Sequence, residues 1–402
     1  RLAGRINSGN MRTQFITEGI TKLEVPELER FRTPAGDYAP SLTRVFYNPL
    51  MELCRDISVS VVQVLANELG AVRICDPLAG VGARGLRYAR EVRGISKVVV
   101  NDRSPDALEF IRKNVALNDL ADLVEIRNED ANALLWGFRP KFHIVDLDPF
   151  GSPAPFVDAA CGAIVRGGVV MLTATDTAPL CGTYPKPCLR RYGARSLRTE
   201  YCHELGLRIL IGFCQRVGGK HELALTPLLA HSTLHYFRVY LRASAGAKRV
   251  DEVMAQQGYV SHCFSCGRRK VSKGIAAELP SFCECGERLA HAGPMWLGQL
   301  VDKRFVERVA ADLASRNFRL GGSALELLNR LAEEGEGPPT FYDVHELARG
   351  AGTSPPKLAR LLEGLRAKGY FASRTHFSPI GLRTDAPLDE VLSFLEEVSA
   401  SR

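Results

Sequence analysis

Short apolar runs alternate with amphipathic stretches between about Val59 and Leu241. The runs have the length and β-branched content of buried strands, and the stretches between them repeat apolar residues at helical spacing. The predicted strands are Val72–Cys75, Lys97–Asn101, Val124–Arg127, Phe142–Leu147, Gly168–Thr173 and Leu234–Arg242. The predicted helices are Arg84–Arg93, Pro105–Asn118 with Ser104 as its cap, and Glu200–Cys214. This alternation predicts an α/β domain with a largely parallel sheet, whose ligands bind beyond the carboxyl ends of the strands.

The pattern changes after Arg242. A small-residue, basic linker, Ala243–Arg249, leads to a group of cysteines and then to helical patterns followed by an extended stretch from Tyr370. The helical patterns cover Ala324–Glu333, Val344–Arg349 and Pro356–Lys368. Their order is typical of a winged helix, with a plain helical appendage as the alternative. We therefore predict two domains, residues 11–242 and a smaller α+β domain of residues 243–402.

Composition excludes several classes of protein. With 402 residues, 46% hydrophobic and 24% charged, the chain has the make-up of a globular protein. Its apolar runs are far shorter than the ~20 residues of a membrane helix, so we expect no membrane contact. The net charge of +7 permits a polyanionic partner without requiring one. An odd number of cysteines, eleven, and the lack of a secretory leader favour a reducing cytoplasm.

A glycine loop follows the first predicted strand. Gly80-Val81-Gly82-Ala83-Arg84-Gly85 fits the pattern G-x-G-x-x-G, in which glycine lets a nucleotide approach the backbone. Alone, this Rossmann-like loop fits NAD, FAD, S-adenosylmethionine or a purely structural turn. Its candidate cofactor contacts are Gly80, Gly82 and Arg84.

Acidic residues at the strand ends decide among these cofactors. Asp76 ends the strand before the loop, where its carboxylate can reach the methionine part of S-adenosylmethionine. Asp102 ends the next strand and can bind ribose hydroxyls. Asp130-Ala131 follows the third strand, where the adenine amino group would lie. Because no cluster of basic residues fills the loop for phosphates, we predict S-adenosylmethionine.

The turn Asp148-Pro149-Phe150-Gly151 follows the fourth strand, where the methyl group would point. An exocyclic amino group is a poor nucleophile, and a carboxylate with a backbone carbonyl would orient it toward the methyl donor. Phe150 would stack on the extruded base. The turn is similar to the [Asp/Asn]-Pro-Pro-[aromatic] signature of amino-directed methyltransferases. The alternative is an ordinary strand-ending turn.

Together these motifs resemble those of the tRNA (guanine-N2)-dimethyltransferases of archaea and eukaryotes, which methylate guanosine 26 of tRNA twice. The resemblance rests on the glycine loop, on the Asp148 turn and on three further stretches: Val45–Pro49 with Arg55-Asp56, Leu180–Gly182, and Cys188–Gly193. It implies a class I methyltransferase domain with a family-specific C-terminal domain. It further implies that Phe46 forms the wall of the base pocket opposite Phe150, and that Arg55 binds the carboxylate of the cofactor.

Four cysteines predict a metal site. Cys263 and Cys266 form C-x2-C, Cys283 and Cys285 form C-x-C, and a glycine follows each pair. Four thiolates suit a structural zinc ion with tetrahedral coordination, held between two turns as in a zinc ribbon. Unmetallated thiols are the alternative.

The leading hypothesis is therefore a tRNA guanine-N2 methyltransferase with zinc in its C-terminal, tRNA-binding domain. A methyltransferase for another RNA guanine or for adenine, and a non-catalytic nucleic-acid binder, are the alternatives. A basic run beside the candidate site is either a solvated face or a contact for phosphates; it comprises Lys186, Arg190, Arg191, Arg195 and Arg198.

Overall fold

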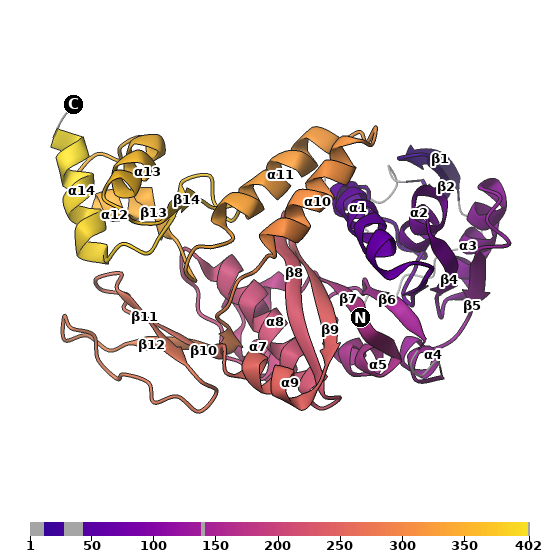
Figure 1. Cartoon of the computed structure of the whole chain (residues 1–402), viewed down its shortest axis with the longest axis horizontal. Coiled ribbons are helices and arrows are strands. Elements are labelled where there is room, and N and C mark those ends of the chain that lie inside the picture. Colours follow the sequence, from indigo (N-terminus) through magenta and orange to yellow (C-terminus); the bar gives the residue numbers. More distant parts are fainter. Residues whose placement is uncertain (1–11, 28–42, 138–140, 401–402) are drawn as a thin grey trace.

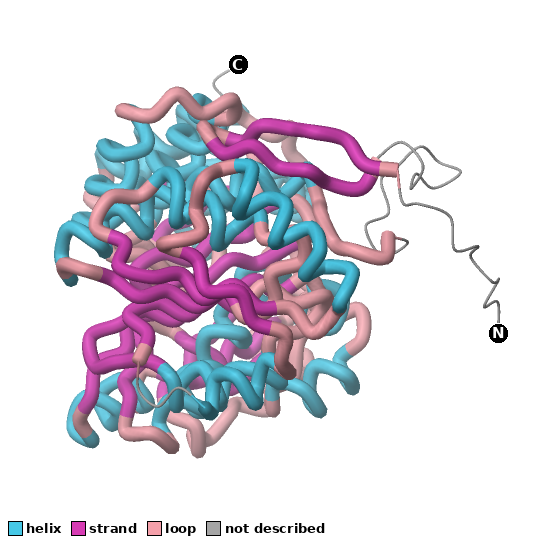
Figure 2. The backbone as a smooth tube through the Cα atoms, turned by 90° about the vertical axis from the view of Figure 1, so that its right-hand side faces the viewer, coloured by secondary structure: helices cyan, strands magenta, loops and turns pink. Residues whose placement is uncertain are grey.

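The computed structural model describes residues 12–27, 43–137 and 141–400. Met11 and Arg402, the outer limits of the two predicted domains, lie outside these ranges. Within them the central element is a seven-stranded mixed sheet of order β5-β4-β3-β6-β7-β9-β8. Figure 2 shows its twisted strands between layers of helices. The strands are β3 (Val72–Asp76), β4 (Ile95–Asn101), β5 (Val124–Arg127), β6 (Phe142–Leu147), β7 (Ile164–Ala174), β8 (Leu223–Thr233) and β9 (Tyr236–Ala245).

The sheet is parallel from β5 to β7 and antiparallel at β9 and β8. The sequence predicts β9 but not its partner β8, so this end of the sheet is a hairpin rather than a single strand. Pro227 interrupts the apolar pattern of β8, and the pairing shifts register between Pro227 and Leu229. A proline is tolerated there because β8 is the edge strand.

Helices cover both faces of the sheet. The predicted helices occur as α2 (Ala83–Glu91), α3 (Pro105–Leu117) and α8 (Cys202–Gly219). Ser104 holds the N-cap position of α3 without a capping bond from its hydroxyl; its N–H donates to Asp102 Oδ1 at 2.9 Å instead. The remaining helices of this part are α1 (Glu52–Leu69), α4 (Ala131–Gly137), α5 (Val157–Ala163), α6 (Thr177–Leu180), α7 (Pro185–Tyr192) and α9 (Ala247–Met254), with short 3-10 turns η3 (Pro49–Met51) and η4 (Ala154–Phe156). A hairpin of β1 (Thr13–Glu18) and β2 (Thr21–Pro26) packs against α2 and α3.

The cysteine cluster belongs to a second, smaller antiparallel sheet. Its order is β11-β10-β12, formed by β10 (Gln257–His262), β11 (Arg269–Lys273) and β12 (Ala290–Trp296). Two helices follow, α10 (Lys303–Ala314) and α11 (Gly321–Glu334), and α10 lies beside α1 (Figure 1). Their buried residues, among them Val306 and Leu328, continue the hydrophobic core of the large sheet.

The last segment has its own core. It consists of β13 (Tyr342–Asp343), α12 (Val344–Gly350), α13 (Leu358–Ala367), β14 (Ala372–Arg374), β15 (Gly381–Thr384) and α14 (Leu388–Ala400). The strands form a small sheet of order β13-β15-β14. Leu361, Leu365, Leu382 and Leu395 pack together inside it. Among the described residues no helix is both long and apolar enough to cross a membrane.

Candidate active site

A small pocket, with a cavity volume of about 20 Å³, lies at the carboxyl ends of β3 and β6. This is the edge of a parallel sheet at which ligands bind. Its lining brings together five of the residues predicted from the sequence, which are Phe46, Arg55, Asp76, Arg84 and Asp148.

The glycine loop forms the turn from β3 into α2. Gly80 has φ +56° and Gly82 has φ +83°, the left-handed region that glycine adopts at little cost. A Cβ on Gly80 would lie 2.5 Å from the backbone oxygen of Phe46. That oxygen also accepts a hydrogen bond from the N–H of Val81 at 3.3 Å. The loop and the segment carrying Phe46 are therefore packed backbone to backbone, which only glycine permits.

Asp76 carries an unpartnered buried oxygen at the pocket. Its Oδ2 accepts from the N–H of Gly85 at 2.9 Å, whereas Oδ1 is buried without a hydrogen-bond partner among the described residues. Burial raises the pKa of Asp76 to about 8, and the nearby Asp146 carboxylate adds to the rise. A cationic donor placed in the pocket would satisfy Oδ1 and restore the carboxylate.

Asp102 and Asp130 lie at neighbouring strand ends but do not line the pocket. Asp102 Oδ2 accepts from the N–H of Gly80 at 2.9 Å, so the carboxylate shapes the glycine loop. Asp130 Oδ1 caps α4 by accepting from the N–H groups of Asn132 and Ala133 at 3.0 and 3.1 Å. Ala131 is buried. Both oxygens of Asp102 and Oδ1 of Asp130 thus already accept backbone N–H groups, which the sequence pattern did not indicate.

Asp148 is held by an arginine from the glycine loop. Arg84 Nη2 and Nε lie 2.7 and 3.2 Å from Asp148 Oδ2. Arg84 is buried, and its Nε is 3.6 Å from Asp146. Although burial opposes the charged form, the carboxylates of Asp148 and Asp146 raise the pKa of Arg84 well above its usual value. Arg84, predicted as a cofactor contact, therefore serves at least to orient Asp148.

Beneath this pair lies a buried ionic layer that sequence reasoning missed. Arg238 donates to Asp146 Oδ1 at 2.7 Å and to Oδ2 at 2.9 Å, and Tyr88 donates to Oδ2 at 2.6 Å. Asp146 and Arg238 are both fully buried. The sequence did carry one signal for it: Asp146 is a charged residue inside an otherwise apolar strand, and a buried charge needs a partner.

Arg55 is bound to a residue that the sequence did not single out. Its Nε donates to Glu18 Oε2 at 2.7 Å, and its Nη2 also pairs with Glu18 and reaches the backbone oxygen of Asn48 at 3.0 Å. Burial alone would raise the pKa of Glu18, yet Arg55 and Arg87 hold it at about 2. These bonds leave Nη1 of Arg55 for a ligand, as judged from the described residues.

The two aromatic rings predicted to face each other across a base are in contact. The centroids of Phe46 and Phe150 are 4.3 Å apart at an interplanar angle of 69°, an edge-to-face pair. Phe150 is 61% exposed, whereas Pro149 is buried. Gly151 bonds Thr175 through both its N–H and its oxygen, at 2.8 and 2.9 Å. A base can enter between the rings only after they separate, and the exposed ring is the one free to move.

The basic run lies on and after α7, next to the Asp148 turn. Ser152 and Tyr192 share a hydrogen bond of 2.7 Å, which ties the turn to the end of α7. Tyr192 is buried and Tyr184 is exposed, so the two tyrosines of the run differ in role. The five basic residues of the run are all exposed.

The four cysteines converge in space. Cys263 and Cys285 Sγ atoms are 3.5 Å apart, as are those of Cys266 and Cys283, and all four sulfurs lie within 4.8 Å of one another. The N–H groups of Gly267 and Gly286 close each pair into a tight turn by donating to the backbone oxygens of Cys263 and Cys283. Two such turns facing each other have the donor set and spacing of a tetrahedral site.

Comparisons with known proteins point in one direction. A family model for N2,N2-dimethylguanosine tRNA methyltransferase matches residues 19–396. A tRNA (guanine(26)-N(2))-dimethyltransferase from Methanosphaera stadtmanae is 41% identical over 394 residues, covering 98% of this chain and 99% of the relative. A tRNA (guanine(26)-N(2)/guanine(27)-N(2))-dimethyltransferase from Aquifex aeolicus is 36% identical over 96% of each chain. The solved structure of Trm1 from Pyrococcus horikoshii with S-adenosyl-L-methionine matches with a TM-score of 0.84 at 35% identity, over 94% of this chain and 99% of that one.

Proposed function

Because this chain belongs to the N2,N2-dimethylguanosine tRNA methyltransferase family, we propose that the pocket at β3 and β6 is its active site. The chain is a tRNA (guanine(26)-N(2))-dimethyltransferase that uses S-adenosylmethionine. The observation that carries the assignment of the site is the meeting of Asp76, Asp148 and Phe46 in one pocket, from three separate sequence motifs.

The residues present fit S-adenosylmethionine. The orphaned Oδ1 of Asp76 can accept from its ammonium group, and Nη1 of Arg55 can donate to its carboxylate. Asp102, whose Oδ2 accepts from the N–H of Gly80, would bind the ribose hydroxyls, and Gly80, Gly82, Asp130 and Ala131 would contact the nucleoside. When bound, S-adenosylmethionine supplies an electrophilic methyl group on a sulfonium.

Asp148 and the backbone oxygen of Pro149 would orient the amino group of guanine. Each accepts one of its hydrogens, which turns the nitrogen lone pair toward the methyl group. Arg84 fixes the Asp148 carboxylate by binding Oδ2, so the side chain is pre-organised before substrate arrives. Phe46 and Phe150 would stack on the two faces of the base once Phe150 swings outward.

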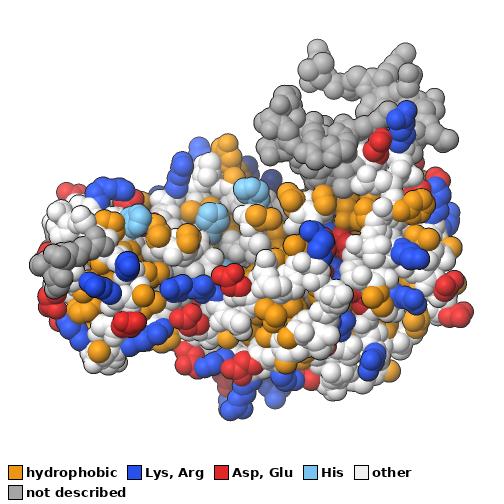
Figure 3. Space-filling model, turned by 90° about the horizontal axis from the view of Figure 1, so that it is seen from above, with side chains coloured by type: hydrophobic (Ala, Val, Ile, Leu, Met, Phe, Trp, Pro, Cys, Tyr) orange, Lys and Arg blue, Asp and Glu red, His pale blue; other side chains and the backbone are white. Residues whose placement is uncertain are grey.

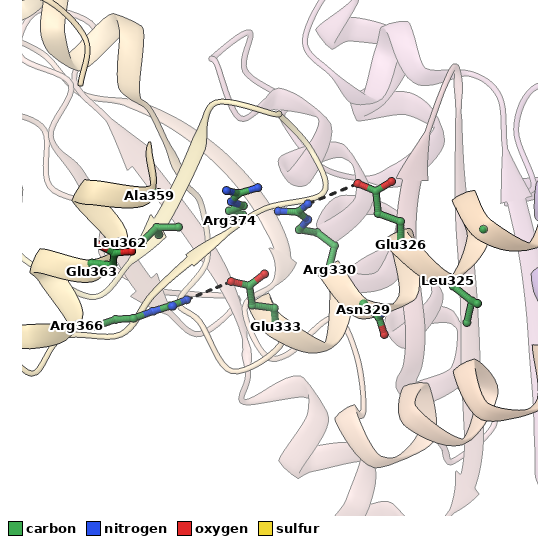
Figure 4. Close-up of a pocket in the computed structure, with 11 residues that line it drawn as sticks. Leu325, Glu326, Asn329, Arg330, Glu333, Ala359, Leu362, Glu363, Arg366 and Arg374 are labelled. Carbon is green, nitrogen blue, oxygen red and sulfur yellow. Dashed lines mark hydrogen bonds and ion pairs between the residues drawn. The ribbon is translucent and has the colours of Figure 1, made fainter. Parts of the chain in front are cut away.

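The C-terminal part, residues 243–402, would bind the body of the tRNA together with the basic run. Its helices α11, α12 and α13 and strands β14 and β15 have the order of a winged helix. Figure 3 shows Lys and Arg interspersed with acidic side chains over this part, so tRNA contact would be distributed rather than concentrated in one patch. Between α11 and α13 lies a groove lined by Arg330, Arg366 and Arg374 (Figure 4).

In that groove one arginine is more available than the others. Arg366 donates to Glu333 at 3.1 Å and Arg330 lies 3.7 Å from Glu326 (Figure 4). Arg374 is exposed and has no ion-pair partner among the described residues. It is therefore the arginine best placed to take a phosphate.

Zinc would occupy the four-cysteine site as a structural ion, because four thiolates leave no position for a reacting water. Free thiols throughout the described chain fit a reducing cytoplasm, where tRNA is also found.

The test of the proposed function is direct. Purified protein is incubated with unmodified tRNA and cofactor labelled on the methyl group, and the tRNA is digested and its nucleosides identified. We expect N2-methylguanosine and N2,N2-dimethylguanosine at position 26, lost when guanine 26 is replaced. Methylated adenine, or label only at another guanine such as 27, would overturn the assignment. Binding without transfer would mean a non-catalytic binder.

A further inference from the structure

A second cluster of thiols lies outside the four-cysteine site. Cys181 directly follows α6, and Cys202 and His203 begin α8. One ligand atom from each of the three residues lies within 4.8 Å of the others, and Cys202 Sγ is 3.9 Å from His203 Nδ1. Cys181 is buried, Cys202 half-buried and His203 exposed. The cluster thus has a closed inner side and an open outer side.

Its dimensions are close to those of a metal site. Zinc binds cysteine sulfur at ~2.3 Å and histidine nitrogen at ~2.0 Å, so tetrahedral ligands lie about 3.3–3.8 Å apart. The observed separations require only small side-chain movements to reach that range. Two thiolates and one imidazole are the ligands preferred by zinc-like ions, and three protein ligands leave a fourth position on the exposed side.

We propose that Cys181, Cys202 and His203 bind a thiophilic divalent ion such as Zn²⁺, in a site separate from the four cysteines. The ion joins the end of α6 to the first turn of α8. The metal-binding claim stands on this geometry alone and does not depend on the methyltransferase assignment.

The position of the site gives the ion a role. The segment entering α6 contains Thr175, which bonds both the N–H and the oxygen of Gly151 in the Asp148 turn. Asp176, the next residue, accepts from Tyr192 at 2.7 Å and from Arg191 at 2.9 Å. An ion that fixes the end of α6 to α8 would therefore hold in place the segment that supports the Asp148 turn. This effect on catalysis, unlike the metal binding itself, rests on the proposed function.

The experiment measures metal in the full-length protein. The metal-free protein is titrated with Co²⁺, and the bound equivalents are determined together with the thiolate-to-cobalt charge-transfer absorption. We expect Cys202→Ser and His203→Gln each to bind one equivalent less than the parent protein. Cys188→Ser is the matched control, because Cys188 is a buried cysteine nearby that is not in the cluster; it should bind the same amount as the parent.

His203→Gln keeps the test decisive if a cysteine variant folds poorly, since His203 is exposed. Equal cobalt binding by the parent, Cys202→Ser and His203→Gln would overturn the proposal. So would a Cys181–Cys202 disulfide that persists in protein kept in reductant throughout purification, because bridged sulfurs do not bind the ion. Loss of the equivalent with unchanged methylation would leave the site standing and remove only its bracing role.

Discussion

At the scale of single residues, the site is made of carboxylates in unlike environments. Asp76 has a buried oxygen without a partner, whereas Asp148 is bound by Arg84. Asp146 is paired with Arg238 and Arg84 and accepts a hydrogen bond from Tyr88. The three carboxylates therefore differ in what they can do: Asp76 has an unpartnered buried oxygen, Asp146 is fully buried, and the side chain of Asp148 is partly exposed at the pocket.

Replacing Asp148 tests the acceptor role. Asp148→Asn should slow methyl transfer by roughly 10²-fold or more, because an amide is a weaker acceptor for the amino hydrogens. Arg84 keeps Asp146 as a neighbour, so the fold and cofactor affinity should change little. Single-turnover methylation and cofactor binding are the measurements, with Asp158→Asn, a carboxylate bound to His221 and Lys220, as the control. Near-normal turnover would remove Asp148 from the mechanism.

The pKa of Asp76, raised to about 8, makes cofactor binding pH-dependent. At pH 7 the free carboxyl holds a proton, and the cofactor's ammonium group stabilises the ionised form, so binding should release a proton. The affinity for the cofactor should then rise by up to ~10-fold from pH 6 to pH 7. This window lies below ~7.7–8, where the α-amino group of the cofactor itself loses its proton. Calorimetry in buffers of different ionisation enthalpy measures the release. Asp76→Asn should bind more weakly and show no release; a parent protein that releases none would contradict this role.

At the scale of elements, the site depends on turns that join distant segments. The backbone oxygen of Phe46 binds the glycine loop, and Thr175 after β7 binds the turn after β6. Strand ends and loops are thereby locked together, while the ring of Phe150 stays exposed above them. In the proposed site, these turns would hold the reacting groups and the exposed ring of Phe150 would move to admit the base.

Removing either ring should weaken base binding. Phe46→Ala and Phe150→Ala should each cost about 1–3 kcal/mol in the binding and reaction of tRNA, the usual worth of stacking one base on an aromatic ring. Phe15→Ala, an exposed ring on β1, is the control. Single-turnover rates and tRNA affinity are compared. If both variants react like the parent, the base does not lie between these rings.

The four-cysteine site should hold together only the small sheet. If zinc occupies the site, it would join the two turns, and Cys266→Ser should then lose one equivalent of zinc and loosen β10–β12. Cofactor affinity should stay unchanged, since the pocket is lined by other elements. Elemental analysis and hydrogen exchange are the measurements. A variant with full zinc content, or a metal-free parent of equal stability, would refute the site.

At the scale of the whole molecule, the C-terminal elements are tied to the catalytic sheet by buried charge. Arg383 on β15 pairs with Glu204 on α8 at 2.8 Å and with Glu334 on α11 at 3.0 Å. Helices α10 and α11 share the main core with α1. A fragment ending near Arg242 would expose that core, so substrate binding is better tested in full-length variants. These pairs link the C-terminal elements to a helix that packs beside the catalytic sheet.

Binding of tRNA should depend on salt and on the groove between α11 and α13. Arg374→Ala should lower tRNA affinity several-fold and reduce the slope of log affinity against log salt by ~1, the effect of losing one phosphate contact. Cofactor affinity should not change with salt or with the substitution. Arg349→Ala, an exposed arginine paired with Glu346, is the control. Equal tRNA affinity and slope in both variants would show that the groove does not bind tRNA.

Local pattern determined much of this protein. Strand–helix alternation, the glycine loop, the position of Asp148 after a strand and the cysteine spacing are local properties, so they could be recognised without a structure. The family followed from the same motifs. The boundaries of α2 and α3 differ from prediction by only a few residues.

Only the tertiary structure decided which partners these residues have. The binding of Arg55 to Glu18, of Arg84 to Asp148 and of Asp146 to Arg238 joins residues far apart in the chain. The spacing of hydrophobic residues along the chain does not predict such pairs, because they form when segments with unrelated sequences become neighbours in the fold. The edge strand β8 was hidden for a related reason: its pairing depends on β9, not on a regular pattern of its own. Local sequence therefore determined the motifs, and long-range packing determined the charge environment in which each one works.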